Sequence, residues 1–392
     1  MTLVNERAAV WTFGLAAVAG LCSSVQAAPP TPAPLCGGQA GLPGWFAPGI
    51  YSGTLGQQRV TLQLKVPGTD DDAVGAYFYA SRQIDLALRG SHRGSALVLA
   101  EEVWAGPEKG LQTTGCLTLN HAAGQHLTGE WKSLQGKNLQ GRRLAVSLAP
   151  LKVKALPLKL LNTPGLRQLR AEQPLTFLKL NTAWARVTGG ATMGAVREPL
   201  TGIVYPRVAG APAALSGALQ DRQLLAAAAA LDCKAQIGDS PSDQGDGFTL
   251  DAAVTRLTPR LVSLHESANY YCGGAHPDNF DTGLILDRQS GQMVKFAALW
   301  PGLNAQKQFE RYTTKYPKAQ GADCLDAVKT GAPNAADGPA FTGWLTPSGL
   351  TLVPTFLPHV VAACAEAVTL TYTELRRLAD PHGPYFADLD LR

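Results

Sequence analysis

The residue types best suited to chemistry gather in one short stretch, "YYCGGAHPDN", at positions 270–279. It contains a cysteine, a histidine and an aspartate, and more ionisable residues lie within a few positions on either side. Imidazoles and carboxylates at such spacing are typical of a metal or acid–base site. The candidate cluster comprises His265, Glu266, His276, Asp278 and Asp281. A structural turn is the alternative interpretation of the same stretch.

Strand geometry argues against a catalytic site. Neighbouring residues of a strand point to opposite faces, so His265 and Glu266 cannot both bind one ion without a bulge. A serine nucleophile would need a strained elbow, and the sequence has no Gly-x-Ser-x-Gly motif. A Cys272–His276 nucleophile is ruled out if Cys272 is in a disulfide. The sequence therefore indicates no catalytic residue, metal ligand or cofactor here, and it favours a binding protein over an enzyme.

The turn interpretation gives each residue type a structural role. Glycines permit a positive φ where a strand reverses, and proline fixes the chain while removing a donor. Aspartate and histidine side chains can bond to nearby backbone or carboxylate groups. The predicted signature turn consists of Gly273, Gly274, His276, Pro277 and Asp278.

The N-terminus is typical of a secretory signal peptide. A polar start leads into the apolar "AAVWTFGLAAVAGLCSSV", and "VQA" predicts cleavage after Ala27. We expect residues 1–27 to be the signal, 28–48 a Pro/Gly-rich leader, and the mature protein to be periplasmic or secreted. Beyond the signal no apolar run reaches the length of a bilayer span, so no transmembrane segment is expected after cleavage.

Six cysteines remain after the signal, an even number that predicts three disulfides in an oxidising compartment. No two of them have the Cys-x-x-Cys spacing of a zinc knuckle. Fifteen pairings are formally possible. If bridges stay inside domains, the simplest set is Cys36 with Cys116, Cys233 with Cys272, and Cys324 with Cys364.

Charge excludes one class of partner. The formal net charge is only +4 over 392 residues, and 16% of the residues are charged. Nucleic-acid-binding proteins need a basic patch that neutralises phosphates, and no such patch is visible. We expect no nucleic-acid partner.

Residues 49–151 read as about eight short strands with polar or Gly-rich breaks, such as "RVTLQLKV" and "VGAYFYAS". One apolar face per strand predicts an all-β domain, a small barrel or sandwich. Its aromatic side chains could line a ligand mouth, although aromatics on strands are more often core residues. The candidates are Tyr77, Tyr79, Trp104 and Trp131.

The rest of the chain is expected to be an α+β module with an antiparallel sheet, so that the protein is multidomain. "PAALSGALQDRQLLAAAAALDC" and "NAQKQFERYTTKYP" predict helices, whereas "LTFLKLNTAWARV" is strand-like. "AVTLTYTELRRLAD" predicts a last strand and a short closing helix. No Gly-rich phosphate loop joins a strand to a helix, which argues against a nucleotide enzyme.

One family resemblance follows from "YYCGGAHPDNFDTGLILDRQSGQMVKFAALWPG" and from "GWLTPSGLTLVPTFLPHVVAACAEAVTLTYTELRRL". These segments resemble the Gly-Gly-Ala-His-Pro signature and the ending of the RsiV-type extracytoplasmic domain, which also occurs in the deacetylase PdaC. The resemblance places this domain at 271–382, its companion segment at 152–270 and a C-terminal tail at 383–392. Pro358-His359 and Cys364 depart from the family's pattern.

The resemblance implies a non-catalytic recognition or sensing module of the cell envelope. The expected partner is a cell-wall glycan or an extracellular protein such as lysozyme. One alternative is a hydrolase or deacetylase of cell-wall glycan whose site the sequence does not reveal, and another is a purely structural envelope protein.

Overall fold

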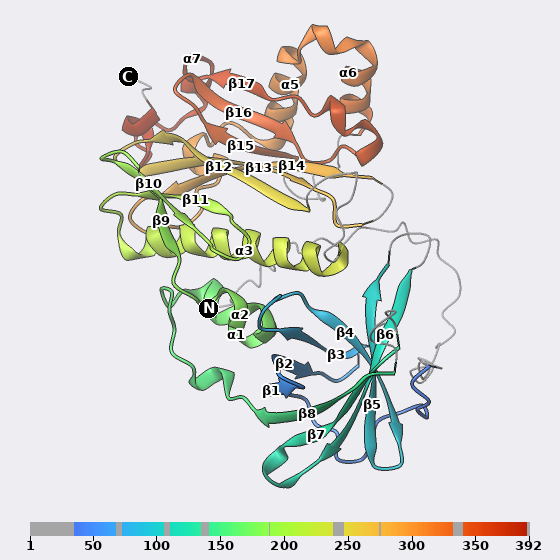
Figure 1. The fold of residues 1–392 in the computed structure, drawn as a ribbon. Helices are drawn as coiled ribbons and strands as arrows, with labels where there is room; N and C mark the ends of the chain where they lie inside the picture. Colours follow the sequence, from blue (N-terminus) through green and yellow to red (C-terminus); the bar gives the residue numbers. More distant parts are fainter. Residues whose placement is uncertain are drawn as a thin grey trace.

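A computed structural model describes residues 35–67, 73–105, 110–134, 141–187, 189–237, 247–273, 276–331 and 340–389. The predicted signal peptide, the first part of the leader and Gly274 of the signature turn lie outside these residues. The chain is multidomain, with an eight-stranded antiparallel barrel followed by a region of antiparallel sheets and helices. Figure 1 shows the barrel at one end of the molecule and the layered α+β region at the other.

The barrel is a meander in which each strand pairs with the next, and it closes where β1 pairs with β8. Leucines dominate the interior because one face of each strand points inward, as the alternating pattern predicted. The strands are β1 (Gly49–Leu55), β2 (Gln58–Leu64), β3 (Ala73–Tyr79), β4 (Leu86–Arg93), β5 (Ala96–Trp104), β6 (Leu111–His121), β7 (Leu127–Ser133) and β8 (Arg143–Pro150).

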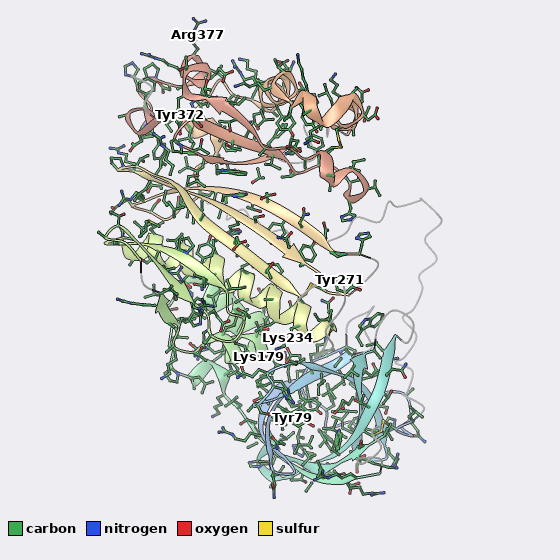
Figure 2. All side chains as sticks on the ribbon, turned by 45° about the horizontal axis from the view of Figure 1, so that its top comes forward. Tyr79, Lys179, Lys234, Tyr271, Tyr372 and Arg377 are labelled. Atoms are coloured by element: carbon green, nitrogen blue, oxygen red, sulfur yellow. A yellow bond between two sulfur atoms is a disulfide. The ribbon has the colours of Figure 1, made fainter. Side chains whose placement is uncertain are left out.

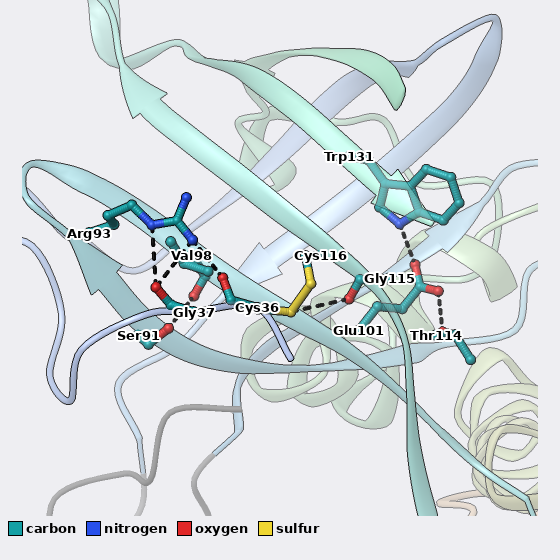
Figure 3. The surroundings of a disulfide bond; sticks show 10 residues. All are labelled: Cys36, Gly37, Ser91, Arg93, Val98, Glu101, Thr114, Gly115, Cys116 and Trp131. Carbon is teal, nitrogen blue, oxygen red and sulfur yellow. Dashed lines mark hydrogen bonds between the residues drawn. A yellow bond between two sulfur atoms is a disulfide. The ribbon is translucent and has the colours of Figure 1, made fainter. Parts of the chain in front are cut away.

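The end of the leader is bound to the outside of the barrel. A disulfide joins Cys36 to Cys116 of β6, and the Arg93 guanidinium donates to the Cys36 carbonyl at 2.7 Å. Gln39 and His92 exchange main-chain hydrogen bonds. Figure 3 shows the Arg93 contacts beside the disulfide. The leader is therefore part of the barrel's covering rather than a free linker.

Two helices, α1 (Pro164–Glu172) and α2 (Pro174–Leu180), follow the barrel. The prediction of a strand over "LTFLKL" was wrong, because this segment is α2. Pro174 begins the helix, a position that tolerates its missing N–H, and Phe177 and Leu180 are fully buried against α1 and α3. Only the end of the strand-like segment is extended, as β9 (Ala185–Val187).

The long helix α3 (Ala213–Ile237) confirms the predicted helix and covers one face of a three-stranded sheet. That sheet contains β12 (Phe248–Leu257), β13 (Leu261–Tyr270) and β14 (Asp278–Asp287), with β13 in the middle. A smaller sheet of β9, β10 (Met193–Arg197) and β11 (Val204–Val208) precedes α3. The division expected at residue 270 falls between β13 and β14, which form one hairpin.

The last layer packs on the other face of this sheet. Its own sheet is formed by β15 (Phe341–Leu345), β16 (Gly349–Pro354) and β17 (Val368–Thr371). The two sheets touch at Gly283 and Gly343, where a Cβ on Gly283 would overlap the Gly343 backbone. The helices of this layer are α4 (Phe296–Leu299), α5 (Ala305–Lys315), α6 (Gly321–Thr330) and α7 (Tyr372–Leu375).

Residues 383–389 of the expected tail are packed into this layer rather than free. Leu389 is fully buried, and the Asp388 carboxylate accepts a hydrogen bond from the Arg260 amide at 3.1 Å.

A buried ion pair joins the barrel to the α+β region. Lys179 of α2 contacts Asp85, between β3 and β4, at 2.7 Å, and its ammonium lies over the Phe78 ring. Figure 2 places Lys179 at this junction. Burial lowers the pKa of Lys179, although Asp85 opposes that effect. A buried lysine without its partner would be strongly destabilising, so the pair fixes α2 against the barrel.

The three disulfides are Cys36–Cys116, Cys233–Cys272 and Cys324–Cys364, the simplest set that the sequence offered. Three bridges are typical of a protein exported to an oxidising compartment. Among the described residues, no helix is long and apolar enough to cross a membrane.

Replacing Cys233 and Cys272 together by serine should lower the free energy of unfolding by roughly 3–4 kcal/mol, because the bridge closes a long loop in the unfolded chain. The sequence separation is 39 residues. Urea unfolding of the variant and the wild-type protein measures the difference. A loss below about 1 kcal/mol would contradict a structural role for this bridge.

Candidate functional site

Glu266 of β13 forms the centre of a buried ion pair. Its carboxylate accepts hydrogen bonds from Arg222 of α3 and from the Tyr205 hydroxyl of β11, and its side chain is only 3% exposed. Burial raises the pKa of Tyr205, as does the neighbouring carboxylate. Burial alone would lower the pKa of Arg222, but the contacts with Glu266 raise it. The pair thus connects three elements and leaves Glu266 with no free acid–base role.

The signature turn connects β13 to β14 and is cross-linked to α3. Cys272 is bonded to Cys233 near the end of α3, and Gly273 has a φ of +89°, which glycine adopts without strain. Figure 2 places Tyr271, the residue before the bridge, close to this end of α3. Trp104 at the end of β5 lies beside Gly273. Gly273 therefore has a positive φ that suits glycine, and Cys272 cross-links the turn to α3.

Asp278 ends this turn and is held by several donors. The Tyr270 hydroxyl donates to it at 2.9 Å, the Asn279 amide at 2.8 Å, and His359 Nδ1 contacts it at 3.0 Å. Burial raises the pKa of Asp278, but these contacts outweigh it and the pKa is lowered. His276 stacks on His359 with the ring centroids 4.0 Å apart.

His265 and Asp281 form a separate pair on the opposite face of the sheet from Glu266. His265 Nε2 lies 2.6 Å from the Asp281 carboxylate, and the imidazole stacks on Trp344 of β15 at 3.9 Å. The expectation that His265 and Glu266 point to opposite faces is confirmed. In the described part of the chain, no group of three or more histidines, cysteines or carboxylates is placed to bind a metal ion.

A groove of about 600 Å³ passes around β14 near these residues. One wall is the C-terminal half of α3, with Leu225, Ala226 and Ala229, and the other is the segment from the end of β16 to Ala365. Asp278 to Thr282 of β14 lie between the walls. Three carboxylates, one guanidinium and the His359 imidazole line the groove. Arg222 is paired with Glu266, and His359 contacts Asp278.

Three of the four candidate aromatics meet inside the barrel around Glu101 of β5. Glu101 is only 5% exposed. Its carboxylate accepts hydrogen bonds from the Tyr77 hydroxyl, the Trp131 indole and the Thr114 hydroxyl. Figure 3 shows Trp131 and Thr114 on the two oxygens. The Tyr79 hydroxyl lies 3.2 Å from the Tyr77 hydroxyl. Burial raises the pKa of both tyrosines.

These aromatics satisfy a buried carboxylate, and Tyr77 and Trp131 belong to the barrel core, which is the alternative that the sequence left open. Trp104 does not join them, because it lies at the end of β5 beside the signature turn.

Several residues of the groove were missed by sequence reasoning. Arg222 stands beside Asp221 and Gln223 in the polar part of α3, so the sequence contained no signal for a buried partner. His359 appeared only as a departure from a family pattern. Leu225 gives no signal, since an exposed leucine on a helix is common.

Comparisons with known proteins assign neither a family nor an activity to this chain. No protein-family model matches the chain, and no curated protein matches it. A DUF3298 family protein from Pseudomonas aeruginosa PAO1 is 18% identical, over 52% of this chain and 97% of its own, with a TM-score of 0.29. A DUF3298 family member from Bacteroides fragilis is 12% identical, over 72% of this chain and 100% of its own, with a TM-score of 0.30. Neither likeness assigns an activity or a ligand.

Replacing Glu101 by alanine should destabilise the protein by about 2–4 kcal/mol, because buried donors lose their acceptor. Glutamine keeps one carbonyl oxygen in the same place, so Glu101→Gln should be less destabilising. Thermal unfolding of both variants and of the wild type measures the order of their stabilities. Equal stability of Glu101→Ala and wild type would show that the cluster contributes nothing.

Replacing His359 by alanine should raise the pKa of Asp278, because one contact that favours the carboxylate is lost. In the wild type the folded-state pKa is below the usual value, so the ionised group stabilises the fold above about pH 4 and loses this effect as the pH falls through the folded pKa. Carbon-detected NMR titration of the Asp278 carboxyl measures its pKa in the wild type and in the variant. An unchanged pKa in the variant would contradict the contact.

Proposed function

We propose that this chain is an exported, non-catalytic binding protein of the cell envelope, periplasmic or secreted, whose ligand occupies the groove around β14. The ligand is a cell-wall glycan or an extracellular protein such as lysozyme, the two classes that the RsiV-type resemblance implies. One observation carries the proposal: the groove combines an apolar wall with polar groups that are already engaged with one another. Such a surface is suited to recognition.

The ionisable groups support binding over catalysis for a physical reason. A general acid or base needs an oxygen or nitrogen atom that can exchange a proton directly with the substrate. Glu266 is bonded to Arg222 and Tyr205, and Asp281 is paired with His265. Asp278 is bonded to Tyr270 and His359. These partners orient the carboxylates and lower their reactivity, as expected at the rim of a binding site.

Binding should be saturable and should depend on the apolar wall. The exported protein, purified with its disulfides intact, is tested against lysozyme by biolayer interferometry and against insoluble peptidoglycan by co-sedimentation. Leu225→Glu places a charge in the groove and should weaken binding to the true ligand at least about tenfold. Leu111→Glu on the barrel is the matched control, since the two leucines are 49% and 53% exposed.

Two outcomes contradict the proposal. Absence of saturable binding to either material would favour a structural envelope protein. Release of reducing sugar or acetate from peptidoglycan that disappears in Asp278→Asn or Asp281→Asn would favour the hydrolase or deacetylase.

A further inference from the structure

The edge of β14 carries main-chain groups that point away from β13, its strand partner among the described residues. In an antiparallel pair, successive residues direct their N–H and C=O groups alternately toward the partner and away from it. The Gly283 amide donates to Thr342 Oγ1 at 2.7 Å, and the Ile285 carbonyl accepts from the Val294 amide at 2.7 Å. The main-chain N–H and C=O groups of Gly283 and Ile285 therefore point away from β13. By the same alternation, so do those of the residues two and four positions before Gly283.

Those residues are Asp281 and Asn279. The Asn279 amide donates to the Asp278 carboxylate. In the part of the chain that the structure describes, the amide and carbonyl of Asp281 and the carbonyl of Asn279 have no hydrogen-bond partner outside β13. The open stretch is bounded by Thr342 at one end and by Pro277, which has no N–H, at the other. Asn279 and Asp281 both line the groove.

An edge of this kind offers alternating donors and acceptors at the spacing of another strand. A polypeptide backbone matches that pattern, whereas the hydroxyl groups of a glycan have no such repeat. We therefore propose that the groove binds an extended segment of another polypeptide, which pairs with β14 at Asp281. This inference rests on the proposed function and names the class of ligand.

The walls of the groove predict the sequence of that segment. A residue placed opposite Asp281 has its side chain on the same face as Asp281, whose carboxylate is paired with His265 and with no arginine or lysine of the groove lining. Its neighbours point to the other face, toward Leu225, Ala229 and Phe280. The segment therefore alternates basic and apolar residues.

The first test uses a fluorescent acetylated and amidated peptide, KVKVK, with the wild-type exported protein. Methylation of the three lysine amide nitrogens removes the N–H groups that face β14 and should weaken binding about tenfold or more. Methylation of the two valine nitrogens, which face away, is the matched control and should change binding much less. Fluorescence anisotropy measures all three dissociation constants.

The second test changes the protein. Asp281→Pro removes the outward N–H, and proline is tolerated on an edge strand at such a position. Asp281→Ala removes the same charge but keeps the N–H, so Asp281→Pro should bind KVKVK several-fold more weakly than Asp281→Ala. Thermal unfolding checks that both variants are folded. If Asp281→Pro is unfolded, the methylated peptides with the wild-type protein decide.

Three results overturn the inference: no binding of KVKVK, equal binding of the two methylated peptides, or equal binding by folded Asp281→Pro and Asp281→Ala. The proposed function can hold when the inference fails. If Leu225→Glu abolishes binding of lysozyme or peptidoglycan while Asp281→Pro retains it, the groove is a binding site but does not bind a strand.

Discussion

The groove depends on the buried ion pair between Arg222 and Glu266. Arg222 continues the stripe of Leu215 and Leu219 that packs on the sheet, and its guanidinium reaches a carboxylate with almost no exposure to water. A buried charge without its partner is strongly destabilising, so α3 must cross the sheet where these two residues meet. Beyond that point the disulfide at Cys233 ties α3 to the signature turn.

This placement leaves one edge of the central sheet uncovered. The second sheet touches β14 at Gly283, where two glycines allow close approach, and the groove opens on the N-terminal side of this contact. The α3 wall is apolar, and the wall before Ala365 includes Leu357 and His359. Recognition through main-chain groups would make the fold itself the source of affinity, with Asp281 selecting basic side chains.

Patterns within single elements predicted the barrel strands and the helix α3, because period and composition are local features. The disulfide pairs join cysteines that follow one another in the sequence, so their order was enough to suggest them. Local patterns misled over Leu175 to Leu180, where a short apolar run fits a strand or a helix and packing against α1 decided. The site could not be predicted, because Arg222, Asp281 and His359 are far apart in the sequence. Only the tertiary fold brings them to one groove.

The most direct test of the account is residue-resolved amide hydrogen exchange of the ligand-free protein by NMR. Along β14 the account predicts strong protection of the Phe280 and Thr282 amides, which face β13, and fast exchange of the Asp281 amide between them. Protection of Asp281 equal to that of its two neighbours would contradict the open edge, and with it the groove as a site for strand addition.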